Sequence, residues 1–174
     1  ANSQTITNFD FKIFKNKTTN VLYYGIKIIG DKLCYKEKIQ FNWTIHDESK
    51  TVFGYKAQKA TTNYMGRNYT AWFSQDLGLS DGPYKFEGLP GLILEISDSE
   101  NHYNFEIIGF EKINSLPLES VPPKDYIISS KQELFKLKES FENDPINYTN
   151  NYKGENGLSI NIPVSGKAKK EALK

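Results

Sequence analysis

Arg67 is the residue whose chemistry stands out most clearly in this sequence. Lysine and arginine together number 22, and Arg67 is the only arginine. A guanidinium is a planar group with five donors, whereas a lysine ammonium is a flexible point charge, so a site that needs bidentate or stacked contacts requires arginine. Three interpretations stay open here: a structural role, engagement of an anionic or planar ligand, and accident.

The two histidines offer little further chemistry. His46 ends a strand pattern on its polar face and His102 opens the second arm of a hairpin pattern, so both are interpreted as solvated residues. Asp98, Glu100 and His102 alternate across one turn and could offer oxygen and imidazole ligands to a cation. A solvated hairpin turn is the favoured interpretation, and the same holds for the run from His46 to Glu48, because adjacent strand residues point in opposite directions. We predict no metal site and no cofactor.

Several motifs typical of enzymes are missing from the chain. We find no phosphate-binding loop, H-E-x-x-H helix or C-x-x-C pair. Cys34 is the only cysteine, which excludes an internal disulfide; lysine-rich surroundings could lower its pKa, but a small buried hydrophobe is the favoured interpretation. We therefore predict a protein that is not an enzyme, and an uncharacterised hydrolase is kept as an alternative.

The elements that must position these residues are mostly strands. Alternation with a period of two places Leu22, Tyr24, Ile26 and Ile28 on one face. The segment 39–45 alternates in the same way, and short candidates follow at 52–55, 60–64 and 69–73, a spacing typical of consecutive hairpins. The clearest hairpin joins an apolar strand beginning at Leu92 to a second arm at 103–107 through the polar turn S-D-S-E-N.

After this hairpin the pattern changes. Three prolines between residues 115 and 125 should end the sheet, because proline gives no amide to a ladder. Residues 131–142 then show helical spacing of apolar side chains, with Ser130 and Glu133 in a capping-box pattern. A last strand is possible at 158–164. We predict a mainly β fold, a curved antiparallel sheet resembling a half-barrel, with one amphipathic helix.

A rigid corner precedes the strand at Leu92. Pro90 fixes its own φ and pushes Leu89 toward an extended conformation, while Gly91 can take the positive φ of a type II turn. Gly88 and Gly91 also permit close approach of another backbone or a ligand. Leu89 at the apex is either a buried plug, which is the favoured interpretation, or an anchor for a partner.

A second turn lies just upstream, at Gly82 and Pro83, and is followed by Tyr84 and Phe86. Two stiff turns and two aromatic residues in so short a span could form the rim of a binding groove, and the aromatic content of 14% could fill a core and still line such a groove. The candidate residues for contact with a ligand or partner are Arg67, Trp72, Tyr84, Phe86 and Leu89, and the candidate structural motif is Gly82, Pro83, Gly88, Pro90 and Gly91.

The stretch from Tyr55 to Asp98 resembles the GLPGLI family of exported proteins from Gram-negative bacteria. The resemblance is carried by several short motifs in the right order: Lys59-Ala60, Gly66-Arg67, Ala71-Trp72-Phe73, Gly82-Pro83 and the run from Gly88 to Ile93. It implies a protein of the periplasm or outer envelope, reached after removal of an export signal, and a role beside TonB-dependent outer-membrane receptors. The family has no established activity.

Two positions depart from the family pattern. Ala57 stands where many relatives have cysteine, which puts a thiol-based role there in doubt. Leu77-Gly78 stands where relatives have an Ile-Pro pair, which suggests a turn of different shape. A weaker analogy links the expected fold to the half-barrels of periplasmic lipoprotein carriers.

Length and charge limit the remaining possibilities. At 174 residues with a formal net charge of +1, the chain has the size of one domain and no global field that would attract nucleic acid. No apolar run approaches the roughly 20 residues of a membrane-spanning helix. The first residue is Ala1, which fits a trimmed or mature form. We predict one β-rich domain over residues 1–166 and a basic flexible tail over 167–174.

These observations favour a non-enzymatic binding or accessory protein of the cell envelope. The expected partner is an outer-membrane receptor or another envelope protein, and the possible ligands are a peptide, a lipid or a small apolar molecule. The alternative is a periplasmic carrier that holds a lipid or an apolar small molecule in a half-barrel cavity.

Overall fold

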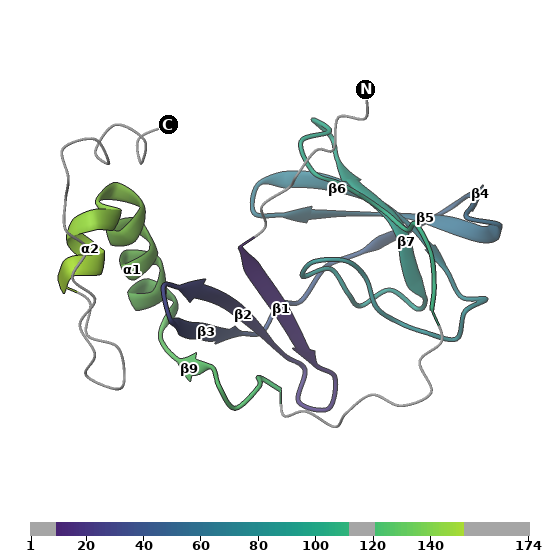
Figure 1. The fold of residues 1–174 in the computed structure, drawn as a ribbon. Helices are drawn as coiled ribbons and strands as arrows, with labels where there is room; N and C mark the ends of the chain where they lie inside the picture. The colour runs from purple at the N-terminus through teal and green to yellow at the C-terminus, as the bar shows by residue number, and fades with distance from the viewer. Residues whose placement is uncertain (1–9, 112–120, 152–174) are drawn as a thin grey trace. The chain divides into compact units, whose positions relative to one another are not determined.

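The computed structural model describes residues 10–111 and 121–151. The chain divides into two compact units, one of residues 1–38 with 118–174 and the other of residues 39–117. Each unit contains its own sheet. Figure 1 shows the strands and helices of both. The single domain over 1–166 stays a prediction, and the tail at 167–174 lies outside the described residues.

The sheet of the first unit has the strand order β1-β2-β3-β9. Strands β1, β2 and β3 are antiparallel neighbours, whereas the short β9 pairs in parallel with β3. The alternating face of β2 is buried as the sequence predicts. The strands are β1 (Phe11–Asn16), β2 (Val21–Ile28), β3 (Asp31–Glu37) and β9 (Ile127–Ile128).

Two helices complete the first unit, α1 (Lys131–Asn143) and α2 (Pro145–Asn151). The capping box is present: the Ser130 hydroxyl accepts from the Glu133 amide at 3.2 Å, and the Glu133 carboxylate accepts from the Ser130 amide at 3.1 Å. Leu134 of α1 is buried in one apolar cluster with Tyr24 and Tyr35 of the sheet. The amphipathic helix predicted from its spacing is therefore confirmed.

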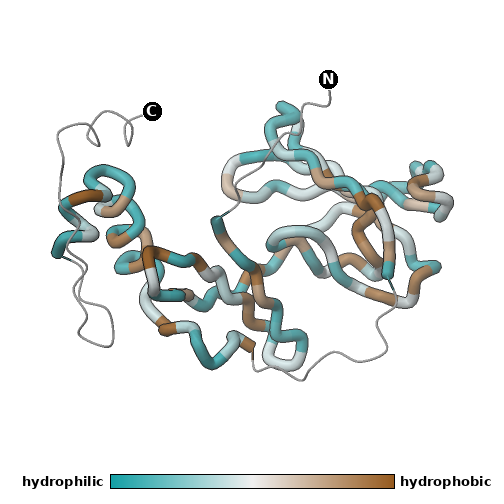
Figure 2. The backbone as a smooth tube through the Cα atoms, viewed as in Figure 1, coloured by the Kyte–Doolittle hydropathy of each residue, from teal (hydrophilic) through white to brown (hydrophobic). Residues whose placement is uncertain are grey.

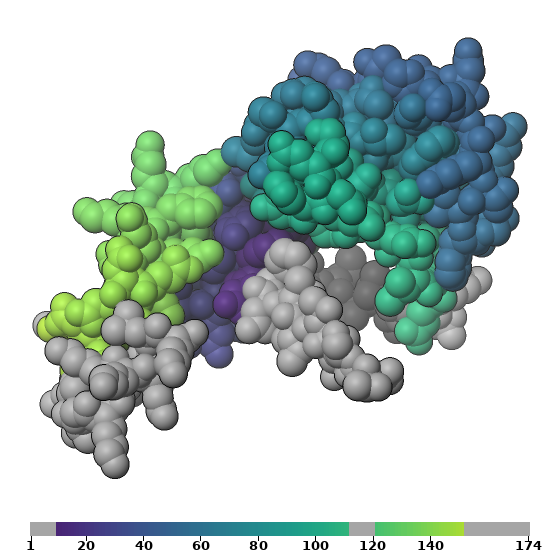
Figure 3. All heavy atoms as spheres, turned by 90° about the horizontal axis from the view of Figure 1, so that it is seen from above, coloured from purple at the N-terminus to yellow at the C-terminus, as the bar shows by residue number. Residues whose placement is uncertain are grey.

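The second unit contains a five-stranded sheet in the order β4-β5-β6-β7-β8, antiparallel throughout. Consecutive strands are neighbours, so the sheet is a meander of hairpins, as the sequence predicts. The strands are β4 (Thr44–Val52), β5 (Tyr55–Tyr64), β6 (Arg67–Ser74), β7 (Leu92–Asp98) and β8 (Asn104–Glu106). Figure 3 shows the atoms of this unit, mostly in blue to green, as one closely packed group of spheres.

One face of this second sheet carries its main apolar core. Ala60, Ala71 and Ile96 are cross-strand neighbours on β5, β6 and β7, and all three are fully buried. The aromatic rings of Phe41, Trp43, Tyr69 and Phe86 pack in the same cluster. Figure 2 shows hydrophobic and hydrophilic residues following one another along the backbone. The buried face comes from β5, β6 and β7, whereas β4 has only Val52 buried and β8 has no buried residue.

The mainly β, antiparallel fold is confirmed, although the strands form two sheets where one curved sheet was expected. The predicted strand at 39–45 is corrected: β4 begins at Thr44, and Phe41 and Trp43 before it pack against the core without ladder bonds. Helix α2 was not predicted. The possible strand at 158–164 lies outside the described residues.

The corner before β7 packs closely against a neighbouring segment of the chain. The positive φ belongs to Gly88, at 93°, and not to Gly91, which corrects the expected turn geometry. Gly91 is required for close approach instead, because a Cβ there would lie 2.3 Å from the Ser74 carbonyl oxygen. Trp43 Nε1 donates to the Glu87 carbonyl at 2.8 Å and fixes the start of the corner.

The turn at Gly82 and Pro83 also requires a glycine for close packing. A Cβ at Gly82 would lie 2.7 Å from the Cδ1 atom of Ile93 and 2.8 Å from the Phe86 carbonyl oxygen. The Phe86 amide donates to the Pro83 carbonyl at 3.0 Å and closes the turn. These contacts explain why Gly82 and Gly91 carry no side chain.

Candidate functional site

Arg67 lies at the start of β6 and is held by residues from the end of β7 and the turn that follows. Its Nη1 atom lies 2.9 Å from Asp98 Oδ2, 3.4 Å from Glu100 Oε2 and 3.1 Å from His102 Nδ1. The guanidinium carbon lies 5.3 Å from the ring centroid of Tyr103. We call these five residues the Arg67 cluster. Arg67 thus places its planar guanidinium, the feature that distinguishes it from lysine, over an aromatic ring while it contacts two carboxylates.

Asp98 is the buried centre of the Arg67 cluster. Its side chain is fully buried, and Oδ1 accepts from the Tyr103 amide at 2.8 Å. The backbone hydrogen bond from Tyr103 and the Arg67 guanidinium lower the pKa of this carboxyl below its usual value, against the opposing effect of burial. The carboxylate therefore joins the two hairpin turns at this end of the sheet.

The donor atoms of Asp98, Glu100 and His102 lie within 4.8 Å of one another, a separation that a metal ion could bridge. Nη1 of the Arg67 guanidinium already contacts all three side chains and offsets part of the charge of the two carboxylates. A metal ion would have to displace it. The geometry therefore supports the structural interpretation of Arg67.

Two of the predicted contact residues are buried. Phe86 is 1% exposed and Leu89 is 2% exposed, and both belong to the core of the second sheet. Ser80 Oγ donates to the Leu89 carbonyl at 2.6 Å and holds the apex of the corner inward. The proposed rim is corrected at these two positions, because neither side chain reaches a partner unless the core opens.

The other two candidates, Trp72 and Tyr84, are partly buried. The Tyr84 ring stacks on Phe105 with an interplanar angle of 4°. Trp72 packs against a smaller apolar cluster, and Lys50 Nζ lies 4.5 Å from its ring centroid. The five predicted contact residues therefore do not form one surface.

A pocket that the sequence did not predict lies at the opposite end of β6 from Arg67. Its origin is a bulge in β4: the register pairs Ile45 with Ala60 and Ser49 with Gln58, so four steps along β4 match two along β5. Gln58 Nε2 donates to the His46 carbonyl at 2.8 Å and satisfies a backbone oxygen within the bulge. Asp47 and Ser49 of the bulged segment line the pocket.

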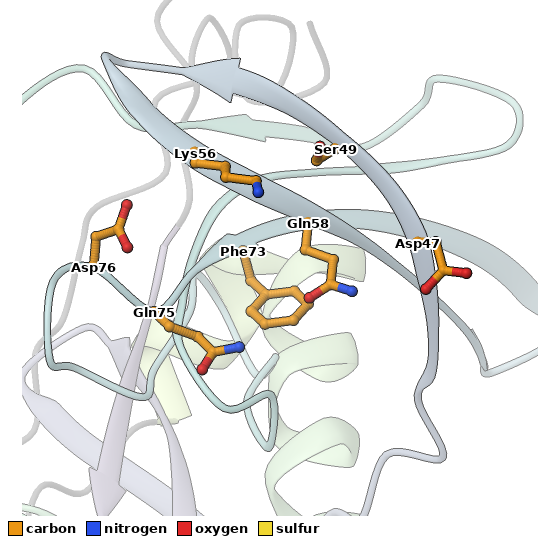
Figure 4. Close-up of a pocket in the computed structure, with 7 residues that line it drawn as sticks. All are labelled: Asp47, Ser49, Lys56, Gln58, Phe73, Gln75 and Asp76. Carbon is orange, nitrogen blue, oxygen red and sulfur yellow. The ribbon is translucent and has the colours of Figure 1, made fainter.

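This bulge pocket has a volume of about 360 Å³. Figure 4 shows the Phe73 ring and the two glutamine amides in the middle of the hollow, with the Asp47 and Asp76 carboxylates apart on either side. Phe73 is 1% exposed, so the floor of the pocket is part of the core. The pocket is lined by Asp47, Ser49, Lys56, Gln58, Phe73, Gln75 and Asp76.

The corner glycine supports one wall of this pocket. A Cβ at Gly91 would lie 2.3 Å from Ser74 O and 3.0 Å from the Gln75 amide nitrogen. The chain can therefore follow β6 into the Gln75–Asp76 wall only because position 91 carries no side chain. The motif that opens β7 thus shapes the pocket without contacting its interior.

The pocket residues were missed because their grouping depends on tertiary structure. The sequence argues against a metal site at His46 to Glu48, because adjacent residues of a regular strand point in opposite directions. A bulge breaks that alternation, and nothing in the local sequence marks where it occurs. The other wall comes from Gln75 and Asp76, beyond two further strands.

Known proteins add information on the fold alone. A family model described as "Protein of unknown function (Porph_ging)" matches residues 65–95, which lie within the stretch that carries the sequence resemblance. That segment includes Arg67 and the corner. No curated protein matches the chain.

Two similar solved structures are described as "Structure of PNGF-II in C2 space group" and "Structure of PNGF-II in P21 space group". The first has a TM-score of 0.60 at 18% identity and covers 75% of this chain, and the second has a TM-score of 0.57 at 16% identity and covers 70%. This chain spans only about a quarter of the length of either, 25% and 23%. At such identities the likeness concerns the fold.

Two further features bear on function. Burial raises the pKa of the Cys34 thiol, so this cysteine has the character of a core residue. Neither of the two described helices is long and apolar enough to cross a membrane.

Proposed function

We propose that this chain is a non-enzymatic binding module of the cell envelope that takes a small polar ligand in the bulge pocket and acts as an accessory to an outer-membrane receptor or another envelope protein. The periplasm or outer envelope is its proposed location, from the resemblance of the segment Tyr55–Asp98 to an exported family. The pocket is the feature that carries the binding role.

The single observation behind this proposal is a set of charged side chains left uncompensated around a preformed hollow. Asp47, Lys56 and Asp76 line the pocket, and within residues 10–111 and 121–151 none of them has an ion pair or a side-chain hydrogen bond. On the other face of the same sheet, Lys50 pairs with Glu95 at 2.6 Å and Lys59 pairs with Glu48 at 2.9 Å. A ligand is the partner that would complete the first set.

The fold is also found as part of a longer chain. PNGF-II contains this fold as about a quarter of a longer chain, so the fold can accompany other parts of a protein. The seven lining residues include no histidine or cysteine, and the nearest histidine along β4, His46, has its Nε2 atom 2.8 Å from Thr61 Oγ1. The lining residues therefore lack the pairing of a serine or cysteine with a histidine base that many hydrolases use.

A carrier of lipid or apolar molecules is the weaker alternative. Acyl chains need an apolar interior, whereas six of the seven residues around the bulge pocket are polar or charged. The buried face of the second sheet is filled by aromatic side chains. We therefore favour a polar ligand.

The test is to fill the pocket. Ser49→Trp places an indole on the pocket wall, and Thr44→Trp is the control on the same strand outside the lining; aromatic residues are favoured in β-strands generally. Protein purified natively from the envelope of the source bacterium should carry a small molecule detectable by native mass spectrometry. We expect Ser49→Trp to lose it and Thr44→Trp to retain it.

The accessory role has its own readout. Tagged wild-type protein should retain one envelope protein in a defined ratio, and the isolated partner should retain this protein in the reverse experiment. Recovery of neither a ligand nor a reciprocal partner, or turnover of any tested ester, amide or glycoside by the wild type, would overturn the proposal.

A further inference from the structure

The bulge pocket has a charge pattern that selects among small ligands. Two carboxylates, Asp47 and Asp76, and one ammonium, Lys56, are its charged groups, so its formal charge is one negative. None of the three is compensated by another described residue. Figure 4 shows the carboxylates on different sides of the hollow, with the Lys56 ammonium between them in this view.

A single opposite charge does not complete this pattern. A simple anion meets Lys56 but is repelled by both carboxylates, and a simple cation leaves Lys56 without a partner. A ligand with two separated positive charges and one negative charge compensates all three groups at once. At neutral pH that charge set is the one carried by a basic α-amino acid: an α-ammonium, a cationic side chain and an α-carboxylate.

We propose that the bulge pocket binds a basic amino acid, free or as the last residue of a peptide short enough for its own α-ammonium to reach an aspartate, with one cationic group at each aspartate and the carboxylate at Lys56. This inference rests on the proposed function, since it names the ligand of the same pocket. The volume of about 360 Å³ lies near the lower end of small-molecule sites, which suits a ligand of one amino acid or a short peptide end.

The neutral groups of the pocket fit the same ligand. Gln75 and Ser49 each offer a donor and an acceptor, and neither side chain has a hydrogen bond to another described residue. The Gln58 amide is already oriented by its bond to the His46 carbonyl, which leaves its oxygen as an acceptor for an ammonium. Phe73 below them is fixed in the core, so the site is formed before binding.

The walls of the pocket are exposed, so each charge pair contributes modestly and is screened by salt. The specificity comes from the sum of three pairs rather than from one strong contact. A neutral polyhydroxylated molecule could use the hydrogen-bonding groups but would leave all three charges uncompensated.

The experiment is a titration of the full chain followed by heteronuclear NMR and calorimetry. The probes are L-lysine, the tripeptide Gly-Gly-Lys, cadaverine, L-glutamate and glucose. We expect L-lysine or the tripeptide to bind with shifts at Ser49, Gln58 and Gln75, and the tighter of the two identifies the source. Asp47→Asn and Asp76→Asn should each weaken binding about fivefold, the effect of one partly exposed charge pair.

Lys56→Met tests most directly whether the carboxylate of the ligand binds at Lys56. It should weaken L-lysine binding and leave cadaverine unchanged or tighter, because cadaverine has no carboxylate. Glu106→Gln removes a charge from exposed β8, outside the pocket lining, and should leave every affinity unchanged.

Three outcomes would overturn the inference: L-glutamate or glucose binds more tightly than L-lysine, Lys56→Met leaves L-lysine binding intact, or no basic probe shifts the pocket signals. If another ligand binds in a manner that Ser49→Trp abolishes, the pocket's binding role stands and only the ligand class is wrong.

Discussion

The Arg67 cluster and the bulge pocket lie at opposite ends of β6, and both gather charged residues of the same types. In the Arg67 cluster the guanidinium contacts Asp98, Glu100 and His102, and Asp98 is fully buried. In the bulge pocket Asp47, Lys56 and Asp76 are exposed and have no such contacts with described residues. The first arrangement is complete within the chain, whereas the second leaves room for a ligand.

The charged residues of the Arg67 cluster stabilise the fold, whereas those of the pocket are available for binding. A buried carboxylate must be compensated by the protein itself, and removing its partner destabilises the fold. Exposed charges around a hollow contribute little to stability, so their identity is free to serve binding. We therefore expect substitutions in the Arg67 cluster to change stability and substitutions in the pocket to change affinity.

The largest effect should come from the core between the two ends. Leu89→Ala should lower the free energy of unfolding by about 2–5 kcal/mol, because it leaves a cavity in a packed cluster. Urea denaturation measures the change, and Leu79→Ala, at an exposed leucine, is the control within about 0.5 kcal/mol of the wild type. If both variants were equally stable, Leu89 would be better explained as a residue that contacts a partner than as a core residue.

Gly91→Ala should both destabilise the fold and disturb the pocket wall. The new methyl group clashes with the Ser74 carbonyl, and we expect a loss of about 1–3 kcal/mol together with altered NMR signals of Gln75 and Asp76. Gly109→Ala, where a Cβ has open space, is the matched control. Unchanged signals in the Gln75–Asp76 wall would show that Gly91 does not shape the pocket.

The contrast between the Arg67 cluster and the bulge pocket is tested by the same Asp→Asn substitution in each of them. Asp98→Asn should lower Tm by several degrees, because it weakens the contacts with Arg67 and the Tyr103 amide, while Asp76→Asn should leave Tm unchanged. Arg67→Lys should also lower Tm, without affecting ligand binding at the pocket. If Arg67→Lys instead abolishes binding and spares Tm, Arg67 is the ligand-binding residue.

Acid should act on the Arg67 cluster in a defined direction. The pKa of Asp98 is lowered in the folded protein, so its stabilising contribution is complete above the ordinary aspartate pKa of about 3.9 and is lost as pH falls through the folded value. The Tm difference between wild type and Asp98→Asn should therefore shrink as the pH is lowered below about 5. A difference that grows at acid pH would contradict the lowered pKa.

The smallest effect on stability belongs to the double variant Asp47→Asn/Asp76→Asn. We expect unfolding within about 0.5 kcal/mol of the wild type, since both groups are exposed and without protein partners. The same variant should lose measurable binding of L-lysine. A marked loss of stability would mean that the pocket aspartates are structural and that the two ends do not differ.

Much of the local structure could be predicted because neighbouring residues decide it. The hairpins follow from alternation between polar turns, and α1 follows from Ser130, Glu133 and the spacing of Leu134 and its neighbours. The start of the β4 strand was misplaced because Phe41 and Trp43 alternate like strand residues but are used for packing. Alternation reports which side chains are buried and does not report which backbone bonds form.

The sequence by itself determined that Arg67 is unique, that the corner at Gly88, Pro90 and Gly91 is stiff, and that the chain folds mainly as hairpins. Only the tertiary structure decided that Arg67 is held by Asp98, that Leu89 is inside, and that a pocket exists. The physical reason is that these features depend on contacts between different strands and turns, such as Arg67 with Asp98 and Gly91 with Ser74, and on a bulge in β4, and no local preference encodes them.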